Sequence, residues 1–95
     1  MIERHITFDV HADRTDAFEA FFSTAYAPTM TKAPGFVRVD LLREMDHPTR
    51  YQMVLRWHDV ESATGWRTSE AHTALQPALN ELFSGNEIQA YDVIA

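Results

Sequence analysis

The residue best suited to acid–base chemistry is His72. It precedes Leu75 by three residues and Leu79 by seven, so a regular helix places all three side chains on one apolar face. A histidine that faces an interior cavity is partly desolvated and can titrate near neutral pH. His72 is therefore a candidate catalytic base. The alternative is a structural histidine, hydrogen-bonded at a helix start after Ser69.

Five further side chains could shape a pocket for a flat ligand. The indole of Trp66 could form a wall and donate its N–H, and it could equally fill the core. Arg43 could bind an enolate or a carboxylate, or form a salt bridge at a strand end. Tyr26 could donate its phenol to a ligand oxygen or pack in the core. Trp57 and Phe22 are expected to be core residues or pocket wall.

Metal and cofactor sites are not predicted. His5 and His11 are six residues apart, which is roughly 20 Å along an extended strand, too far for one ion. No other histidine spacing is typical of a metal site, and the chain has no cysteine. Its three glycines are isolated, so no phosphate-binding loop is expected, and no serine nucleophile motif occurs.

Composition favours a small folded protein without a nucleic-acid or membrane partner. The 95 residues include 45% apolar and 12% aromatic residues, which is enough for an ordinary core, and we expect one domain over residues 1–95. The net charge is −6, and no basic stripe for nucleic acid is present. No apolar run approaches the ~18 residues of a membrane span, and the N-terminus is unlike a signal peptide. We therefore expect a cytoplasmic protein.

Alternating and helical patterns predict the elements that position these side chains. Alternation predicts strands over residues 4–11, 36–45, 50–58 and 87–94. A first helix follows capping candidates at residues 13–16 and is limited or kinked by Pro28. Asp59 and Ser69 are both plausible helix caps, so the second helical region is predicted as two segments. Its apolar stripe runs from Leu75 to Phe83, and Gly85 is the expected stop.

This order predicts an α+β, ferredoxin-like β-α-β-β-α-β fold, with both helices on one side of a four-stranded antiparallel sheet. The other face would carry Leu42, Val54, Tyr91 and Val93 among Arg38, Asp40 and Arg56, unless the face assignment is reversed. Such a face is too apolar to be left in water. We therefore expect a homodimer in which a partner sheet covers it.

Several sequence motifs resemble one known family, the antibiotic biosynthesis monooxygenases. They are Ala33-Pro34-Gly35-Phe36, then Leu41-Leu42-Arg43, then Arg50-Tyr51, then Trp57, and a W-x-x-S-x-x-H stretch from Trp66 to His72. The resemblance extends over essentially the whole chain. It implies a dimeric α+β barrel with a ligand pocket between sheet and helices in each subunit, and it places Trp66 at that pocket.

The resemblance also implies an activity. The family includes cofactor-independent monooxygenases that act on a small aromatic, polyketide or quinol-type compound. On that basis His72 would remove a proton from the ligand, and the resulting anion would react with O2 without a cofactor. The alternative from a different class is a non-catalytic, small-ligand-binding or stress-related dimeric barrel protein, because one fold serves many functions.

A haem-degrading branch of the family is disfavoured. Those enzymes use an Asn on the first strand, a Trp in the second helical region and an axial His nine or ten residues after that Trp. Trp66 matches, but the later positions are Leu75 and Gln76, and Ile6 stands at the Asn position. Haem binding would require a different iron ligand, His72, which lies about one helical turn before the expected position of the axial His.

Overall fold

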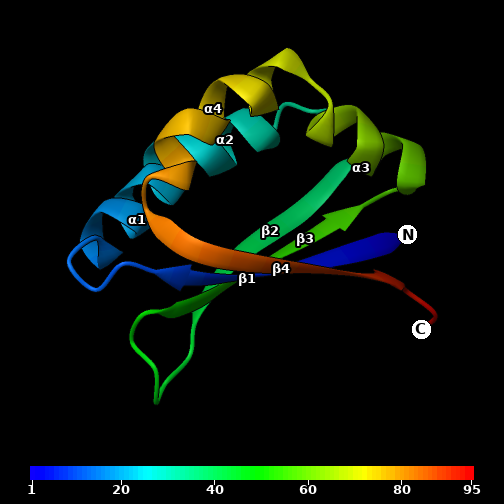
Figure 1. The fold of residues 1–95 in the computed structure, drawn as a ribbon. Coiled ribbons are helices and arrows are strands. Elements are labelled where there is room, and N and C mark those ends of the chain that lie inside the picture. Colours follow the sequence, from blue (N-terminus) through cyan, green and yellow to red (C-terminus); the bar gives the residue numbers. More distant parts are fainter.

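A computed structural model describes all 95 residues as four strands packed against one layer of helices (Figure 1). In chain order the elements are β1 (Ile2–Val10), α1 (Thr15–Phe21), the π-helix η1 (Phe22–Tyr26), α2 (Ala27–Met30), β2 (Phe36–Arg43), β3 (Arg50–Trp57), α3 (Val60–Arg67), α4 (Glu70–Asn80) and β4 (Phe83–Asp92).

The sheet has the order β2-β3-β1-β4, and every neighbouring pair is antiparallel. The central strand β1 pairs Phe8 with Tyr51 of β3 and Ile6 with Ile88 of β4. All helices cover the same face of the sheet (Figure 1). The predicted ferredoxin-like α+β fold is therefore confirmed.

Alternation along the central strands fills the space between sheet and helices. The buried positions of β3 are Tyr51, Met53, Leu55 and Trp57, each at most 2% exposed. The helices contribute further buried apolar side chains, among them Phe18, Ala63, Trp66 and Leu79. Burying one large apolar side chain contributes about 1.5–3 kcal/mol, so each of these residues adds substantially to the stability of the fold.

The first helical region has an unexpected course. Helix α1 begins after Arg14 without a side-chain cap, so none of the four candidate residues at 13–16 provides that bond. The chain then widens into the π-helix η1 and returns to α-helix with Pro28 in the first turn of α2. A proline is tolerated there because its missing N–H is not needed. Pro28 thus marks a change of helix type, and the helix continues to Met30.

The second helical region has the two predicted segments. The Asp59 carboxylate accepts from the Ser62 backbone N–H at 2.8 Å and begins α3. The Ser69 hydroxyl oxygen accepts from the His72 backbone N–H at 3.1 Å and begins α4, while its own O–H donates to the Trp66 carbonyl. Both caps act as predicted. Ser69 also links Trp66 to His72 through the turn between the two helices.

The predicted end of the second helical region is wrong. Helix α4 ends at Asn80, and β4 begins at Phe83, four residues before the predicted start of the last strand. The His11 N–H donates to the Leu82 carbonyl, so this segment leaves the helix to follow the first strand. Gly85 lies inside β4 and does not stop a helix. Leu82 is buried as predicted, although it lies in the turn between α4 and β4.

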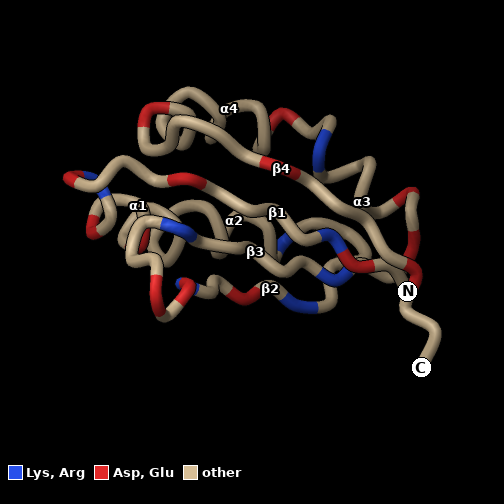
Figure 2. Tube along the Cα trace, turned by 60° about the horizontal axis from the view of Figure 1, so that its bottom comes forward, with Lys and Arg blue, Asp and Glu red and all other residues tan.

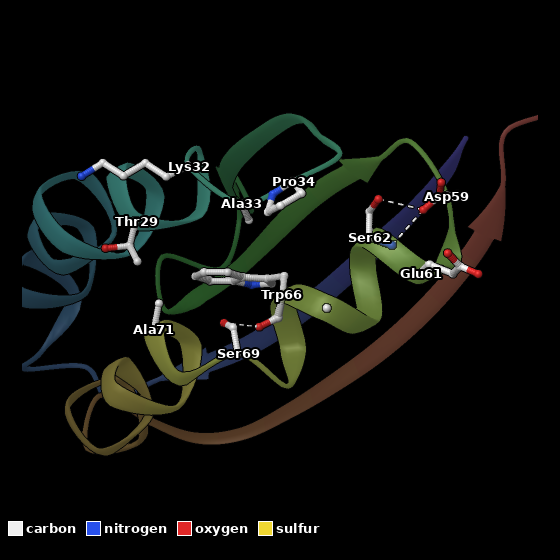
Figure 3. Close-up of a pocket in the computed structure, with 11 residues that line it drawn as sticks. Thr29, Lys32, Ala33, Pro34, Asp59, Glu61, Ser62, Trp66, Ser69 and Ala71 are labelled. Carbon is white, nitrogen blue, oxygen red and sulfur yellow. Dashed lines mark hydrogen bonds between the residues drawn. The ribbon is translucent and has the colours of Figure 1, made fainter.

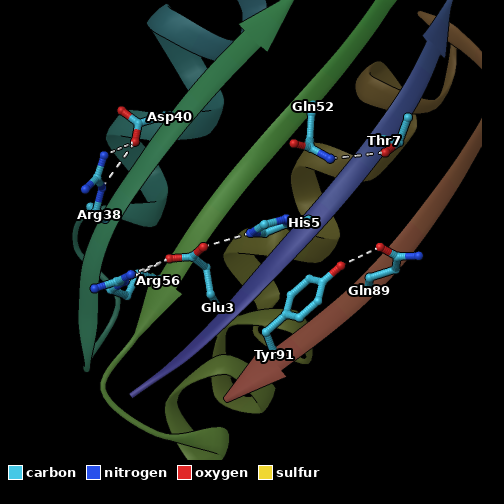
Figure 4. Close-up of polar contacts among 9 residues, drawn as sticks. All are labelled: Glu3, His5, Thr7, Arg38, Asp40, Gln52, Arg56, Gln89 and Tyr91. Atoms are coloured by element: carbon cyan, nitrogen blue, oxygen red, sulfur yellow. Dashed lines mark hydrogen bonds and ion pairs between the residues drawn. The ribbon is translucent and has the colours of Figure 1, made fainter. Parts of the chain in front are cut away.

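The sheet face opposite the helices carries a network of polar side chains (Figure 4). Glu3 of β1 accepts from Arg56 of β3 at 2.9 Å and lies 2.7 Å from His5. Leu42 and Tyr91 are 49% and 45% exposed on this face, as the sequence predicted. Because of the network around Glu3, the face is nevertheless more polar than expected. All four strands carry charged residues (Figure 2).

No helix in the structure has the length and apolar character needed to cross a membrane.

Candidate functional site

An inner cavity of about 210 Å³ lies between the sheet and helices α3 and α4, with one side formed by β1 and β4. Most of its wall is apolar, and the polar groups are few, as in ligand sites generally. The residues that line it are Arg4, Ile6, Phe8, Tyr26, Leu55, Trp66, Arg67, His72, Gln76, Leu79, Phe83, Asn86 and Ile88.

His72 is held at this cavity by its position in the first turn of α4. Its ring packs edge-on against Trp66, with ring centres 5.2 Å apart, and lies 6.4 Å from the ring of Tyr26. The side-chain amide nitrogen of Gln76, one turn later, lies 3.0 Å from His72 Nε2. An amide N–H donates, so Nε2 accepts and the neutral ring carries its proton on Nδ1.

The surroundings of His72 favour its neutral form. Burial lowers the pKa of His72 below its usual value of 6.5, and the nearby Arg67 charge acts in the same direction. The backbone of Arg67 opposes this by favouring the charged ring. A neutral imidazole has one lone pair that can accept a proton, which is the requirement for a general base, and in His72 this lone pair on Nε2 is released only when Gln76 moves away.

Trp66 lines the cavity and also packs against the core. Its ring stacks on Trp57 with centres 6.4 Å apart and an angle of 26°, and it meets Tyr26 edge-on at 5.9 Å. The indole Nε1 of Trp66 is buried and has no hydrogen-bond partner. A buried donor without a partner is costly. This nitrogen has almost no accessible surface, so a ligand oxygen reaches it only if the indole shifts.

Tyr26 reaches the cavity from the last position of η1 and is 2% exposed. Burial raises the pKa of Tyr26 to about 12, and the Trp66 side chain opposes that rise. The phenol therefore keeps its proton throughout the neutral range and can act only as a neutral donor or acceptor.

The other three residues predicted for the site lie elsewhere. Trp57 is fully buried behind Trp66 and does not line the inner cavity. Arg43 and Phe22 line a separate hollow beside β2. There Arg43 is mostly exposed and pairs with Glu19 at 3.5 Å. The structure thus brings His72, Trp66 and Tyr26 together and leaves Arg43 and Phe22 apart from them.

Four polar residues of the cavity were missed by the sequence analysis. Arg4 occupies an inward position of β1 between Ile2 and Ile6, and its inward direction could have been read from that alternation. Gln76 follows His72 by one helical turn, a spacing that brings side chains together. Arg67 and Asn86 gave no comparable signal in the sequence, because each lies near the end or start of an element.

A second, larger hollow of about 550 Å³ lies outside the helices, and Trp66 is part of its wall (Figure 3). We call it the outer groove. It is wide open, and its polar residues come mainly from α3 and the loop before β2, with Asp59 already engaged in capping that helix. The outer groove holds no histidine, so the inner cavity is the better candidate for acid–base chemistry.

No three His, Cys, Asp or Glu side chains come together in a way that could hold a metal ion. Among the residues that a haem-degrading site would use, Ile6, Leu75 and Gln76 provide no strong iron ligand. His72 is the single histidine on the wall of the inner cavity, and it is hydrogen-bonded to Gln76. The residues present therefore do not fit a haem site of that kind.

Comparisons with known proteins show a similar fold. The cofactor-independent oxygenase SnoaB from Streptomyces nogalater has a similar structure, with a TM-score of 0.89, 26% identity, and coverage of 99% of this chain and 93% of that chain. A conserved protein from Methanosarcina mazei superposes with a TM-score of 0.84 at 21% identity, covering 95% and 89% of the two chains. A search of the curated proteins gave no match.

The sequence profile described as "Antibiotic biosynthesis monooxygenase" matches residues 1–78, which include β1 to β3 and both Trp66 and His72. The match covers most of the chain, and the similar structures cover nearly all of it. The chain therefore belongs to the antibiotic biosynthesis monooxygenase family.

Proposed function

We propose that the protein is a cofactor-independent monooxygenase that acts on a small aromatic, polyketide or quinol-type compound. The observation that supports this most directly is the neutral, half-buried His72 at the wall of a mostly apolar cavity. Membership of the monooxygenase family and the similarity to a cofactor-independent oxygenase support the same reaction class.

In the proposed reaction, His72 removes a proton from a phenol or from an activated CH group of the bound ligand. The resulting anion is electron-rich enough to transfer an electron to O2, and the two radicals combine. Collapse of the peroxide that forms leaves one oxygen atom on the substrate as a carbonyl and releases the other as water. The substrate supplies all the electrons, so no metal or flavin is required.

The other residues of the cavity have supporting roles in this proposal. Trp66 provides a flat wall for the ring of the ligand. Tyr26 offers a protonated phenol on the same side. Trp57 supports Trp66 from behind. Arg43 and Phe22 have no contact with a ligand in this cavity.

The test is oxygen uptake with a panel of anthrone and hydroquinone compounds, comparing the unchanged protein with His72→Ala. A matched control is His47→Ala, because His47 is exposed in the turn between β2 and β3. We expect uptake above the uncatalysed rate that falls by roughly 10²–10⁴-fold in His72→Ala, the usual contribution of a general base, and is unchanged in the control.

Uptake that is equal in His72→Ala and in the unchanged protein would remove His72 as the base. Tight binding of these compounds without any oxygen consumption would favour the alternative, a non-catalytic small-ligand-binding or stress-related protein. One observation favours that alternative: His72 Nε2 is already engaged by Gln76, so the lone pair that a base needs is occupied.

We further propose that the protein forms a homodimer through the sheet face opposite the helices. Leu42 and Tyr91 leave apolar surface exposed on that face, and polar groups such as Glu3 are already paired within the chain. Paired charges can be buried at lower cost than free ones. The family resemblance, which implies a dimeric barrel, supports the same arrangement.

A further inference from the structure

Two arginines line the inner cavity without any acidic partner. Arg4 points inward from the central strand β1, and Arg67 is the last residue of α3, directly after Trp66. None of the residues that line the cavity is an Asp or a Glu. The arginines of this chain that do form ion pairs are Arg38, Arg43, Arg50 and Arg56.

The position of Arg4 is costly for a charged side chain. Its register partners are Leu55 of β3 and Ala90 of β4, and its neighbours on the same face of β1 are Ile2 and Ile6. A charge in apolar surroundings destabilises the fold unless something compensates it. Burial lowers the pKa of Arg4, and the like charge of Arg67 lowers it further. Arg4 forms no ion pair within the chain, although Asp92 of β4 lines a hollow beside it.

The two unpaired arginines contrast with the acidic character of the chain. The whole chain has a net charge of −6, with 14 acidic residues available as partners. The two guanidinium groups at the inner cavity nevertheless face only His72, Asn86 and Gln76 among polar neighbours on its wall. The cavity is thus locally positive in a negatively charged protein. A bound anion would supply the missing partner.

The guanidinium group matches a carboxylate particularly well, because its planar N–H groups can form two parallel hydrogen bonds. Arg67 is exposed and Arg4 is half-buried, so solvent reaches both arginines, whereas Trp66 on the same wall is buried. We propose that the ligand is an aromatic carboxylate, held by its carboxylate between Arg4 and Arg67 with its ring against Trp66.

This inference rests on the proposed function for its catalytic use, and it names the class of substrate that the monooxygenase would accept. The arginines are charged at all working pH values, so they would hold the ligand before His72 removes a proton. The carboxylate therefore orients the ring and takes no part in the transfer of oxygen. Binding can be measured with compounds that do not react with O2.

The experiment compares 1-naphthoate with 1-naphthamide, which has the same ring and a neutral group in place of the carboxylate. Binding is followed through the fluorescence of the two tryptophans, one of which lies on the cavity wall. We expect the naphthoate to bind at least about tenfold more tightly, because a hydrogen bond to a charged group contributes roughly that factor. Added salt should weaken naphthoate binding selectively.

Arg67→Gln and Arg4→Gln should each reduce this preference and leave the affinity for naphthamide unchanged. The control is Arg14→Gln, an exposed residue before α1 that is remote from the cavity. Arg67 is exposed, so its variant is expected to fold even if Arg4→Gln does not; circular dichroism checks both.

Equal affinity for the two probes, no binding of naphthoate at millimolar concentration, or an unchanged preference in Arg67→Gln would each overturn the inference. The oxygen-uptake test is independent of these outcomes. A preference for naphthoate without any oxygen uptake would retain the anion site and reject the oxygenase. Oxygen uptake without a preference for naphthoate would retain the oxygenase and reject the anion site.

Discussion

His72 is suited to acid–base chemistry by its surroundings as much as by its residue type. Edge-on contacts with Trp66 and Tyr26 fix the ring, and Gln76 fixes which nitrogen carries the proton. The same contacts exclude part of the solvent and so disfavour the charged ring. At the scale of single residues, the site combines a neutral base with the protonated phenol of Tyr26 and the flat wall of Trp66.

The pH dependence of the proposed reaction follows from this arrangement. A base acts in its deprotonated form, so the rate should rise with pH as His72 loses its proton and then reach a plateau. Because burial lowers the pKa of His72, the midpoint of that rise should lie below 6.5. The measurement is kcat/KM against pH, which reports groups of the free enzyme. A midpoint at or above 6.5 would contradict the assignment.

The sequence identified three of the cavity residues and missed the arginines, for a physical reason. His72, Trp66 and Tyr26 have distinctive side chains whose value for chemistry does not depend on strand register. Arg4 was passed over as a polar residue at the start of a strand, although its alternation with Ile2 and Ile6 places it on the inner face, as does its pairing with Leu55. Arg43 shows the opposite case, because its chemistry was suitable but its side chain lines a separate hollow beside β2.

At the scale of elements, strand boundaries were predicted accurately where they depend on neighbouring residues and less accurately where they depend on long-range pairing. The hairpin strands β2 and β3 start at Phe36 and Arg50, as alternation predicted, and end within two residues of the predicted positions. The start of β4 was misplaced because Leu82 and Phe83 also fit the period of a helix. Only the long-range pairing of Leu82 and Phe83 with the first strand shows that these two residues lie outside the helix.

Two glycines allow a paired test of how the elements fit together. Gly35 has a φ of 79°, and a Cβ built there would lie 2.0 Å from Ser62 Oγ and 2.4 Å from Ser62 Cβ. Gly65 lies inside α3, and a Cβ there meets nothing within 4 Å. Gly35→Ala should therefore destabilise the fold, whereas Gly65→Ala should stabilise it by about 0.4–1 kcal/mol.

The free energy of unfolding in urea measures both glycine variants. We expect Gly35→Ala to lose at least about 1 kcal/mol from the left-handed backbone alone, with the clash at Ser62 adding to that loss. If both variants had the same stability as the unchanged protein, the close approach of the β2 start to α3 would not hold in solution.

At the scale of the whole molecule, the small core and the polar outer face raise the question of assembly. Fourteen of the 95 residues are buried in the isolated chain, all of them apolar, so the core is small. A second copy packed on the outer face would bury Val54, which lies at the centre of that face between His5 and Asp40 in register.

Light scattering at micromolar concentration tests this assembly. We expect a mass of twice the 10.9 kDa of one chain, and a shift toward one chain for Val54→Glu, because this variant would bury a second carboxylate directly beside Asp40 in the interface. Met45→Glu is the control, since Met45 is 98% exposed in the turn between β2 and β3. A single-chain mass for the unchanged protein would reject the dimer.

The π-helix η1 has a consequence for how this cavity could arise or be lost during evolution. A π-turn accommodates one more residue than an α-turn, so it is equivalent to a single-residue insertion into an ordinary helix. Everything after the insertion is rotated by roughly 100° about the helix axis, which is the angle between successive residues. Tyr26, at the end of η1, owes its inward direction to that rotation. Relatives that lack the extra residue would present a different side chain to Trp66, so one codon gained or lost could change the ligand while the sheet stays the same.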